Sequence, residues 1–252
     1  MREFFDVTVL SILQGVAEFL PISSSGHLVI GQHLLGLDVP GMRLDLMLHF
    51  GTLVSICVFY WRTIWRIVAK FEWQYVLKIV LSALPAIVVY FFFRDFIEGL
   101  FENAKMVGAL LMFTGAILIG TRYLPRGDRK VGFLRALGMG LGQAVALLPG
   151  VSRSGMTLAA ARGGRVGPDA AAEFSFLMSA PLIMGGVFLE FMKGEVGAGG
   201  MSWAVLTWGV ILSAIVGYLS LALLIKALKG RWFWLFGPYC VIAGLATLIF
   251  CR

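Results

Sequence analysis

The sequence predicts an all-α polytopic membrane protein with six transmembrane helices and two re-entrant helical hairpins, arranged as an inverted-topology repeat. Three observations predict this fold. Of the 252 residues, 59% are hydrophobic and 14% are charged, and the mean hydropathy is +0.89. Several apolar segments are long enough to cross a bilayer, and two others are interrupted by similar polar motifs. A soluble globule of this length needs more charged surface than this composition supplies.

Six segments have the composition of membrane-spanning helices, which need about 20 mainly apolar residues. Two of them contain no charged residue, and the other four reach this length when flanking charged side chains snorkel to the interface. In chain order the predicted spans are 46–61, 76–93, 106–121, 174–191, 203–225 and 232–251.

Two further apolar segments, 4–35 and 131–163, do not fit simple spans. The first is interrupted by Pro21-Ile-Ser-Ser-Ser-Gly-His27 and the second by Pro149-Gly-Val-Ser-Arg-Ser-Gly155. Pro and Gly weaken helical hydrogen bonding, and irregular backbone at membrane depth persists only where it lines a protein cavity. Both segments are therefore expected to form re-entrant hairpins with polar tips.

The two tips resemble each other, and each is followed by three predicted spans. The chain is thus one membrane domain, 1–252, with repeat 1 at about 1–124 and repeat 2 at about 131–252. An odd number of spans per half inverts the second half in the membrane. Interrupted helices that meet near the midplane are typical of this architecture.

Basic residues predict the orientation. If the first hairpin enters from outside, 14 Lys and Arg residues lie on the cytoplasmic side and six lie outside, while Arg153 lies in the second tip. The positive-inside rule favours this arrangement, with both termini outside. The net charge of +7 is dispersed between apolar runs, so we expect no nucleic-acid binding. The three cysteines have no metal-type or redox spacing, and no cleavable signal peptide is visible.

Gln14 and Glu18 share one face of the first helix because they are four residues apart. A carboxylate this deep is costly and usually faces a cavity or a partner. The simpler alternative is a packing contact in which the following hydroxyls cap Glu18.

Ser23, Ser24, Ser25 and His27 follow at the predicted start of the next helix. Such serines often act only as helix N-caps, and a lone histidine is more often structural than catalytic. Next to an acid, the cluster suits proton transfer or attack on an anionic substrate.

The second tip carries an anion-binding pattern. Gly150 lets the backbone turn, and a helix predicted around 156–161 directs N–H groups into the gap. The guanidinium of Arg153 suits phosphate oxygens, and Ser152, Ser154 and Thr157 add further donors. Arg153 needs an anionic partner at this depth.

That partner is either a phosphate group or one of two carboxylates, Glu18 and Glu173. Glu173 is also a weaker candidate for substrate binding, because it lies at the start of a span and can equally serve helix packing. Asp45 and His49, four residues apart, either edge a cavity or sit at the interface.

Together these motifs resemble the undecaprenyl-pyrophosphate phosphatases of the bacitracin-resistance type. The resemblance rests on Gln14-Gly-Val-Ala-Glu18, Phe19-Leu-Pro-Ile-Ser-Ser-Ser-Gly-His27 and Leu148-Pro-Gly-Val-Ser-Arg-Ser-Gly-Met-Thr157. It runs essentially from end to end and includes 45–51 and 172–177.

The resemblance implies a multi-pass enzyme of the bacterial inner membrane whose active site opens to the outer face. Such enzymes hydrolyse undecaprenyl pyrophosphate to undecaprenyl phosphate and inorganic phosphate, which recycles the lipid carrier of peptidoglycan synthesis, and they usually depend on a divalent cation. The family's roles fall on Gln14, Glu18, Ser24, His27 and Arg153. Gln14 stands where many members have Glu, so a metal site with two carboxylates is in doubt.

The expected mechanism follows from phosphoryl transfer, in which positioning and charge neutralisation dominate. Arg153 and the second tip hold the pyrophosphate, and Glu18 with Gln14 binds Mg²⁺ or Ca²⁺. Ser24 with His27 as its base, His27 itself, or water attacks the terminal phosphorus. The alternative function is a polyprenyl-phosphate flippase that uses the same headgroup site without hydrolysis. The sequence leaves a homodimer open.

Overall fold

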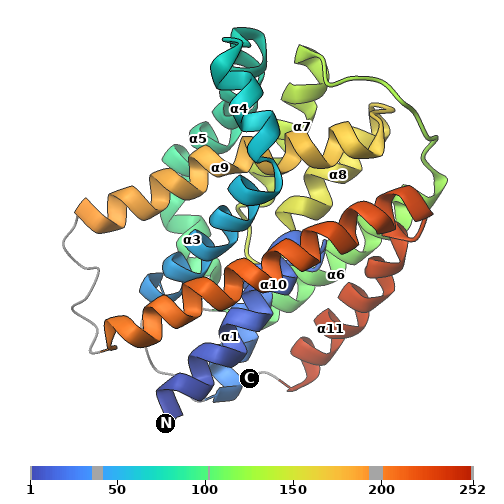
Figure 1. The fold of residues 1–252 in the computed structure, drawn as a ribbon. Helices are drawn as coiled ribbons and strands as arrows, with labels where there is room; N and C mark the ends of the chain where they lie inside the picture. Colours follow the sequence, from blue (N-terminus) through green and yellow to red (C-terminus); the bar gives the residue numbers. More distant parts are fainter. Residues whose placement is uncertain (1, 36–41, 102, 193–200, 251–252) are drawn as a thin grey trace.

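The fold of the chain is helical throughout the part that the computed structural model describes, which comprises residues 2–35, 42–101, 103–192 and 201–250 (Figure 1). These ranges contain no β-strand, and one isolated bridge joins Arg129 to Val166. The fold class predicted from composition is confirmed at this level.

The described residues of the first half form six α-helices. The break between α1 and α2 coincides with the first polar motif, and α3 and α4 meet at an angle of 70°. The helices are α1 (Arg2–Phe19), α2 (Ser24–Leu35), α3 (Met42–Phe59), α4 (Trp61–Ala69), α5 (Trp73–Phe101) and α6 (Ala104–Gly120).

In the second half of the chain, the first helical segment is again interrupted, between α7 and α8, and long apolar helices follow it. A short 3₁₀ turn, η1 (Thr121–Tyr123), precedes it, and another, η2 (Phe233–Leu235), leads into the last helix. The helices are α7 (Phe133–Val145), α8 (Arg153–Gly163), α9 (Pro168–Met192), α10 (Trp203–Gly230) and α11 (Phe236–Phe250).

Among the described residues, five helical segments are long and apolar enough to cross a membrane, and the bent pair α3 and α4 raises the number to six if it forms one span. The five are 73–101, 104–123, 168–188, 203–230 and 233–250. Each coincides with a span predicted from the sequence, and the bent pair covers the predicted span 46–61. The chain is therefore a multi-pass membrane protein.

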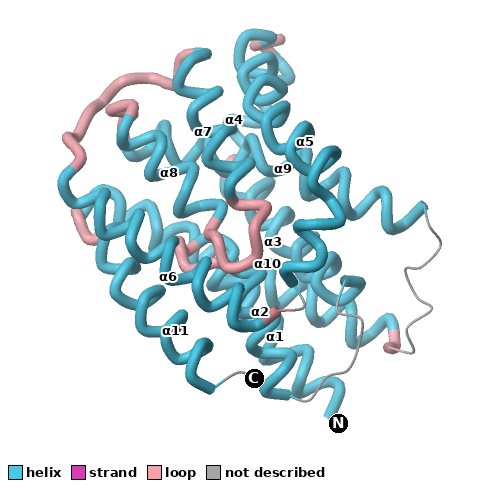
Figure 2. The backbone as a smooth tube through the Cα atoms, turned by 180° about the vertical axis from the view of Figure 1, so that it is seen from behind, coloured by secondary structure: helices cyan, strands magenta, loops and turns pink. Residues whose placement is uncertain are grey.

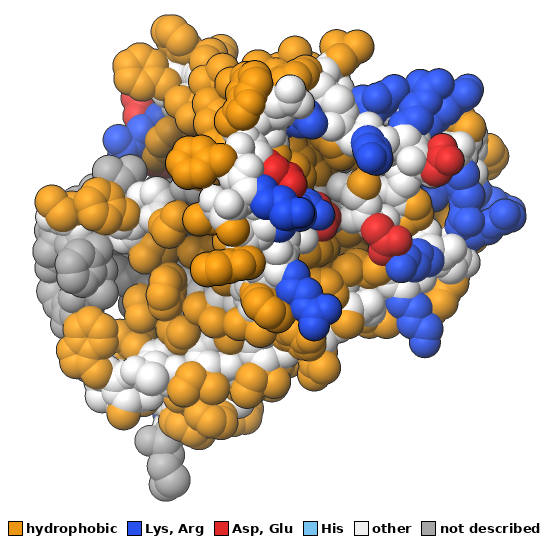
Figure 3. Space-filling model, turned by 45° about the horizontal axis from the view of Figure 1, so that its top comes forward, with side chains coloured by type: hydrophobic (Ala, Val, Ile, Leu, Met, Phe, Trp, Pro, Cys, Tyr) orange, Lys and Arg blue, Asp and Glu red, His pale blue; other side chains and the backbone are white. Residues whose placement is uncertain are grey.

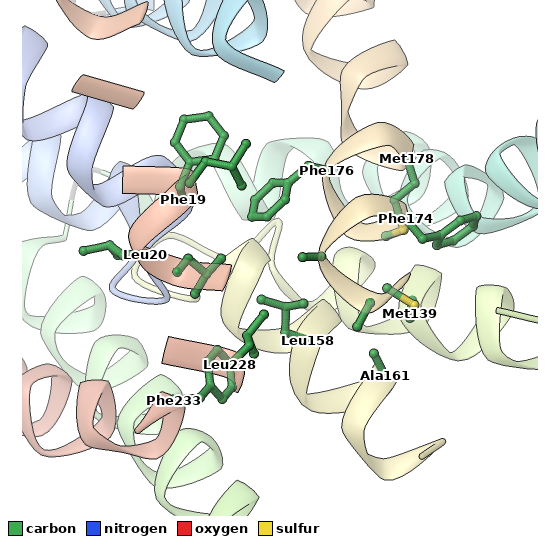
Figure 4. Close-up of a cluster of buried hydrophobic side chains, with 14 of the residues drawn as sticks. Phe19, Leu20, Met139, Leu158, Ala161, Phe174, Phe176, Met178, Leu228 and Phe233 are labelled. Atoms are coloured by element: carbon green, nitrogen blue, oxygen red, sulfur yellow. The ribbon is translucent and has the colours of Figure 1, made fainter. Parts of the chain in front are cut away.

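Hydrophobic side chains occur both on the surface of the protein and in its core. Large hydrophobic side chains such as Phe91, Trp65 and Ile242 are exposed, which suits contact with lipid rather than water. On the face shown in Figure 3, hydrophobic side chains dominate and Lys and Arg gather towards one side. Inside, Phe19, Phe174 and Phe176 pack with other apolar side chains (Figure 4).

Small residues bring helices of the two halves together. A Cβ atom on Gly15 of α1 would lie 2.8 Å from the Val216 Cβ atom of α10. A Cβ atom on Gly140 of α7 would lie 2.3 Å from the Ser82 carbonyl oxygen of α5. Close backbone approach of this kind is how membrane helices associate without a hydrophobic driving force. These two contacts hold α1 against α10 and α7 against α5.

Candidate functional site

The first tip is the turn between α1 and α2. Ser23 adopts a left-handed conformation with φ of 69°, which reverses the chain after Pro21. The Ser23 hydroxyl accepts a hydrogen bond from the Gly26 N–H at 3.3 Å, so Ser23 caps α2. The N-cap role that the sequence allowed for these serines thus belongs to Ser23, and Ser24 is left for other contacts.

The second tip is the turn between α7 and α8. Gly150 has φ of +91°, and a Cβ atom there would lie 2.3 Å from the Val107 carbonyl oxygen, so the position requires glycine. The Ser152 hydroxyl accepts a hydrogen bond from the Gly155 N–H at 3.1 Å and caps α8. As a result α8 begins at Arg153, three residues before the helix expected from the sequence.

The Thr114 side chain on α6 fixes this second turn. Its hydroxyl donates to the Gly150 carbonyl at 3.0 Å and accepts from the Ser152 N–H at 3.2 Å. The sequence analysis did not single out Thr114, because nothing in a long apolar helix marks the residue that contacts a turn elsewhere in the chain.

The two tips meet inside the protein. A Cβ atom on Gly26 would lie 3.2 Å from the Gly150 Cα atom, and the Ser154 hydroxyl donates to the Leu20 carbonyl at 3.2 Å. Figure 2 shows loop segments in the centre of the molecule, surrounded by helices, as well as at its periphery. The polar motifs, more than 100 residues apart in sequence, therefore form one cluster.

Glu18 is the centre of this cluster. Its Oε1 atom pairs with the Arg153 guanidinium. Its Oε2 atom accepts hydrogen bonds from the Ser24 hydroxyl at 2.7 Å and the Gln14 amide at 3.2 Å, and His49 Nε2 lies 3.4 Å away. Of the two carboxylates that the sequence offered to Arg153, the structure selects Glu18.

Arg153 keeps part of its donor capacity free. Its side chain is 16% exposed and lies over the Phe176 ring. The Nη1 atom is buried and has no hydrogen-bond partner within the described part of the chain. A buried guanidinium N–H without an acceptor is costly, so this arm is available to an incoming oxyanion.

His27 lies in the same tip but contacts other groups. Its Nδ1 atom is 2.9 Å from the Ser23 carbonyl, and its Nε2 atom is 2.7 Å from the Tyr239 hydroxyl. Because a carbonyl only accepts, Nδ1 carries a proton, and a neutral His27 accepts from Tyr239 through Nε2. The two rings are nearly parallel, with an interplanar angle of 13°. In this arrangement no His27 contact reaches Ser24, the residue for which it was the expected base.

His49 is the imidazole that reaches Glu18. Its Nδ1 atom lies 2.6 Å from the Asp45 carbonyl, which fixes the ring with Nε2 towards the carboxylate. The Asp45 side chain in turn accepts a hydrogen bond from Gln32 at 2.8 Å. In the sequence, the four-residue spacing of Asp45 and His49 suggested only that they edge a cavity or sit at the interface. The contact of His49 with Glu18 was not predicted.

The remaining predicted residues divide into two groups. The Ser25 hydroxyl lies 3.4 Å from that of Ser23, and the Thr157 hydroxyl lies 2.6 Å from that of Ser175, so these groups border the cluster. Glu173 does not join it.

The Glu173 carboxylate accepts hydrogen bonds from Thr63 and Tyr75 at 2.9 and 3.3 Å and lies 3.7 Å from Arg66. It therefore connects α9 to α4 and α5. In this structure Glu173 contacts these three groups and not Arg153, and its assignment to substrate binding stays a prediction.

The residues fit a divalent cation only in part. Within the described ranges, no group of three or more His, Cys, Asp or Glu side chains is arranged to hold a metal. However, the Gln14 Oε1 atom is buried without a partner beside the Glu18 carboxylate. Two such oxygens suit Mg²⁺ or Ca²⁺ when phosphate oxygens and water complete the shell.

The cluster as a whole has the chemical groups that suit an anion. It combines a guanidinium, the serine hydroxyls at two helix starts, and one buried carboxylate, in a setting where electrostatic interactions are strong. Tyr239 completes the tip from α11, and the sequence gave no sign of it, because this contact joins residues 212 positions apart.

Comparisons with known proteins show the family of the chain. Residues 7–246 match the family model described as bacitracin resistance protein BacA. The chain is 37% identical to an undecaprenyl-diphosphatase of Desulforudis audaxviator, and the alignment covers 97% of each chain. Undecaprenyl-diphosphatases of Desulforapulum autotrophicum and Christiangramia forsetii are 35% and 37% identical, each aligned over 98% of both chains. The chain therefore belongs to the bacitracin resistance protein BacA family.

Proposed function

We propose that the protein hydrolyses undecaprenyl pyrophosphate to undecaprenyl phosphate and inorganic phosphate. The observation that carries this proposal is the Glu18–Arg153 pair at the meeting point of the two tips, with one guanidinium arm unpaired. The names of the relatives supply the substrate. In a cell the reaction returns the lipid carrier to cell-wall synthesis.

The second tip holds the pyrophosphate. The free arm of Arg153 binds a phosphate oxygen, and Ser152, Ser154 and Gly150 supply further donors or close backbone approach. Binding of the substrate competes with Glu18 for the guanidinium and releases the carboxylate for the reaction. Catalysis then consists mainly of positioning and charge neutralisation, as phosphoryl transfer requires.

The first tip supplies the attacking group. Ser24 donates its hydroxyl proton to Glu18 at 2.7 Å, the geometry of a nucleophile beside its base. In the proposed step the Ser24 oxygen bonds to the terminal phosphorus, undecaprenyl phosphate leaves, and Glu18 takes the proton. Water then hydrolyses the phosphoserine. His27 serves as acid or base only if it leaves Tyr239.

A divalent cation would be held by the Glu18 carboxylate and the Gln14 Oε1 atom. When bound, it would neutralise charge on the phosphate oxygens. A chelator such as EDTA should then abolish the activity, and added Mg²⁺ or Ca²⁺ should restore it.

The inverted repeat is part of the proposal, and matched contacts support it. Ser23 and Ser152 each cap a helix through the N–H of a glycine three residues later. Each also lies within 3.4 Å of a second serine hydroxyl two residues on. The same helix start thus occurs in both halves of the chain.

The contact between α6 and α11 gives independent support. One sequence offset relates Gly26 to Gly155, Gly108 to Gly237, and Gly115 to Gly244. A Cβ atom on Gly108 would lie 2.9 Å from the Gly244 carbonyl, and one on Gly115 would lie 2.7 Å from the Gly237 carbonyl. The offset exchanges these two antiparallel contacts, as a two-fold axis in the membrane plane would. Figure 1 shows the two helices side by side.

The orientation has the first hairpin entering from outside, so that the site opens to the outer face of the inner membrane. The basic residues near the ends of α6, α8 and α10 then lie in the cytoplasm, as the positive-inside rule requires. Cysteines introduced at Asp128 and Gly99 in a cysteine-free background test this with a membrane-impermeant reagent. Labelling of Gly99→Cys alone in intact cells supports the orientation, and labelling of Asp128→Cys alone contradicts it.

We also propose that the protein forms a homodimer. Gly185 and Gly138 have open space where a Cβ atom would lie, and small residues of this kind allow close helix approach. The mass of the purified protein in detergent, measured by light scattering with the detergent contribution subtracted, distinguishes a dimer from a monomer.

Phosphate release from undecaprenyl pyrophosphate by the purified protein in detergent tests the function. Metal-dependent release that is lost in Ser24→Ala supports hydrolysis. Folded protein that releases no phosphate, but moves undecaprenyl phosphate between leaflets of a vesicle, would establish the flippase instead. The comparisons give that alternative no support.

A further inference from the structure

An apolar groove of about 320 Å³ lies between α5 and α7. Its walls come from Val89, Phe93 and Ile97 on α5, and from Leu141, Ala144 and Leu148 on α7 and the residues that follow it. The groove exposes almost no polar atoms. It adjoins the second tip directly, because Leu148 immediately precedes Pro149 and Gly150.

We propose that this groove binds the first isoprenoid units of the substrate, next to the pyrophosphate. The inference rests on the proposed function and adds the place of the lipid tail. The volume is at the low end for ligand pockets, so the groove takes only the proximal part of the tail. The remainder lies in the bilayer.

The difference between the two halves singles out this groove. Phe19 and Leu20 occupy, before Pro21, the positions that Leu147 and Leu148 occupy before Pro149. In the first half these positions are closed, since Phe19 is 0% exposed and its Cε2 atom lies 2.7 Å from where a Cβ atom on Gly217 of α10 would be. In the second half both leucines are only half-buried.

The junction of α1 with α10 is thus packed next to the first tip. The corresponding junction of α7 with α5 is close at Gly140 and Ser82 but leaves the groove next to the second tip. A single lipid needs one such groove beside the headgroup site. In the proposed orientation, the groove lies in the outer half of the bilayer, where a substrate reaching the outer face would lie.

The shape of α5 adds a second observation. Phe93, in the wall of the groove, departs from helical geometry with φ of −122° and ψ of 17°. A break of the helical ladder is a local cause of bending, and here it lies eight residues after Pro85. The break in α5 thus lies within the wall of the groove.

Another apolar groove, of about 370 Å³, lies between α3 and α10 and is lined by Val58 and Leu219 among others. None of its lining residues belongs to either tip. It is therefore the natural comparison: a groove of similar size and apolar character without access to the proposed headgroup site.

Leu141→Trp and Leu219→Trp test the assignment as a matched pair, because both leucines are exposed, at 56% and 63%, and each lines one groove. The readout is the ratio of kcat/KM for farnesyl pyrophosphate to that for isopentenyl pyrophosphate. This ratio measures what the proximal tail contributes and is insensitive to a uniform loss of activity.

Filling the proposed groove should lower this ratio about 10-fold, in the range that small changes in apolar pockets produce, while Leu219→Trp should leave it unchanged. Val89→Phe, from the opposite wall, should lower it in the same direction and serves if Leu141→Trp does not fold.

An unchanged ratio in both groove variants, or an equal fall in Leu219→Trp, overturns the groove assignment and leaves the proposed function standing. The groove would then hold ordinary membrane lipid. If the wild-type protein releases phosphate from neither compound, nor from undecaprenyl pyrophosphate, the proposed function fails and the assignment falls with it.

Discussion

Glu18 and Arg153 are 135 residues apart in sequence and form a buried ion pair that joins the two interrupted helices of the protein. Burying either charge without the other at this depth would cost a large free energy. The ion pair therefore stabilises the contact between the two tips. It also places the proposed base, Glu18, next to the proposed anion-binding group, Arg153.

The pair makes a prediction about stability. Glu18→Gln or Arg153→Gln alone should lower the free energy of unfolding by about 3–5 kcal/mol, because each leaves an uncompensated buried charge. The double variant should regain most of this loss. Thermal unfolding in detergent measures the effect, and additive losses in the double variant would show that the two charges do not stabilise each other.

Ser24→Ala should lower phosphate release about 100-fold or more, because it removes the proposed nucleophile, while the fold is kept. Ser220→Ala provides the control, since Ser220 bonds only to the Val216 carbonyl one turn earlier on α10. A phosphoenzyme trapped by rapid acid quench of the wild-type protein should carry its phosphate on Ser24. If phosphate is found on His27, or activity persists in Ser24→Ala, this assignment is wrong.

His49 carries the prediction that differs most from the sequence analysis. His49→Ala should lower kcat about 10-fold, because the contact with Glu18 disappears and the carboxylate is less firmly oriented. His49→Gln should recover part of this loss, since an amide N–H can still reach Glu18. The thermal midpoint should change little in either variant. Equal losses in both would argue against a hydrogen-bonding role.

Gly150→Ala tests the geometry of the second tip. A Cβ atom at φ of +91° and 2.3 Å from the Val107 carbonyl forces the turn to move, so both stability and phosphate release should fall sharply. Gly138→Ala on α7 has open space and should raise stability by up to about 1 kcal/mol, because alanine is the better helix former. A harmless Gly150→Ala would mean that the tip tolerates a different backbone.

Much of the fold was predictable because a membrane-spanning helix can be recognised from its own stretch of sequence. Apolar runs of the right length identified the spans, and the Pro and Gly residues with hydroxyls around 21–27 and 149–155 identified the two breaks. The cost of a buried guanidinium also predicted that Arg153 has an anionic partner, and Glu18 was one of the candidates beside Glu173 and a phosphate group.

The rest depends on contacts between distant parts of the chain. Tyr239 reaches His27 from α11, and Thr114 reaches the second tip from α6, and neither residue is distinguished within its own segment. The contacts of Glu173 were not predictable for the same reason. A carboxylate at the start of an apolar helix looks alike whether it faces substrate or, as here, Arg66 and two hydroxyls on neighbouring helices.

The most direct test of the two-tip site compares Arg153, which pairs with Glu18, with Arg66, which pairs with Glu173 and Glu72 outside the site. The measurement is the initial rate of phosphate release from undecaprenyl pyrophosphate by folded Arg153→Gln, Arg153→Lys and Arg66→Gln. The Arg153 variants should lose at least about 100-fold, the lysine variant included because it lacks the planar fork, whereas Arg66→Gln should stay near the wild-type rate. An active Arg153→Gln, or an Arg66→Gln that loses as much, would contradict the assignment of the active site to the meeting of the two tips.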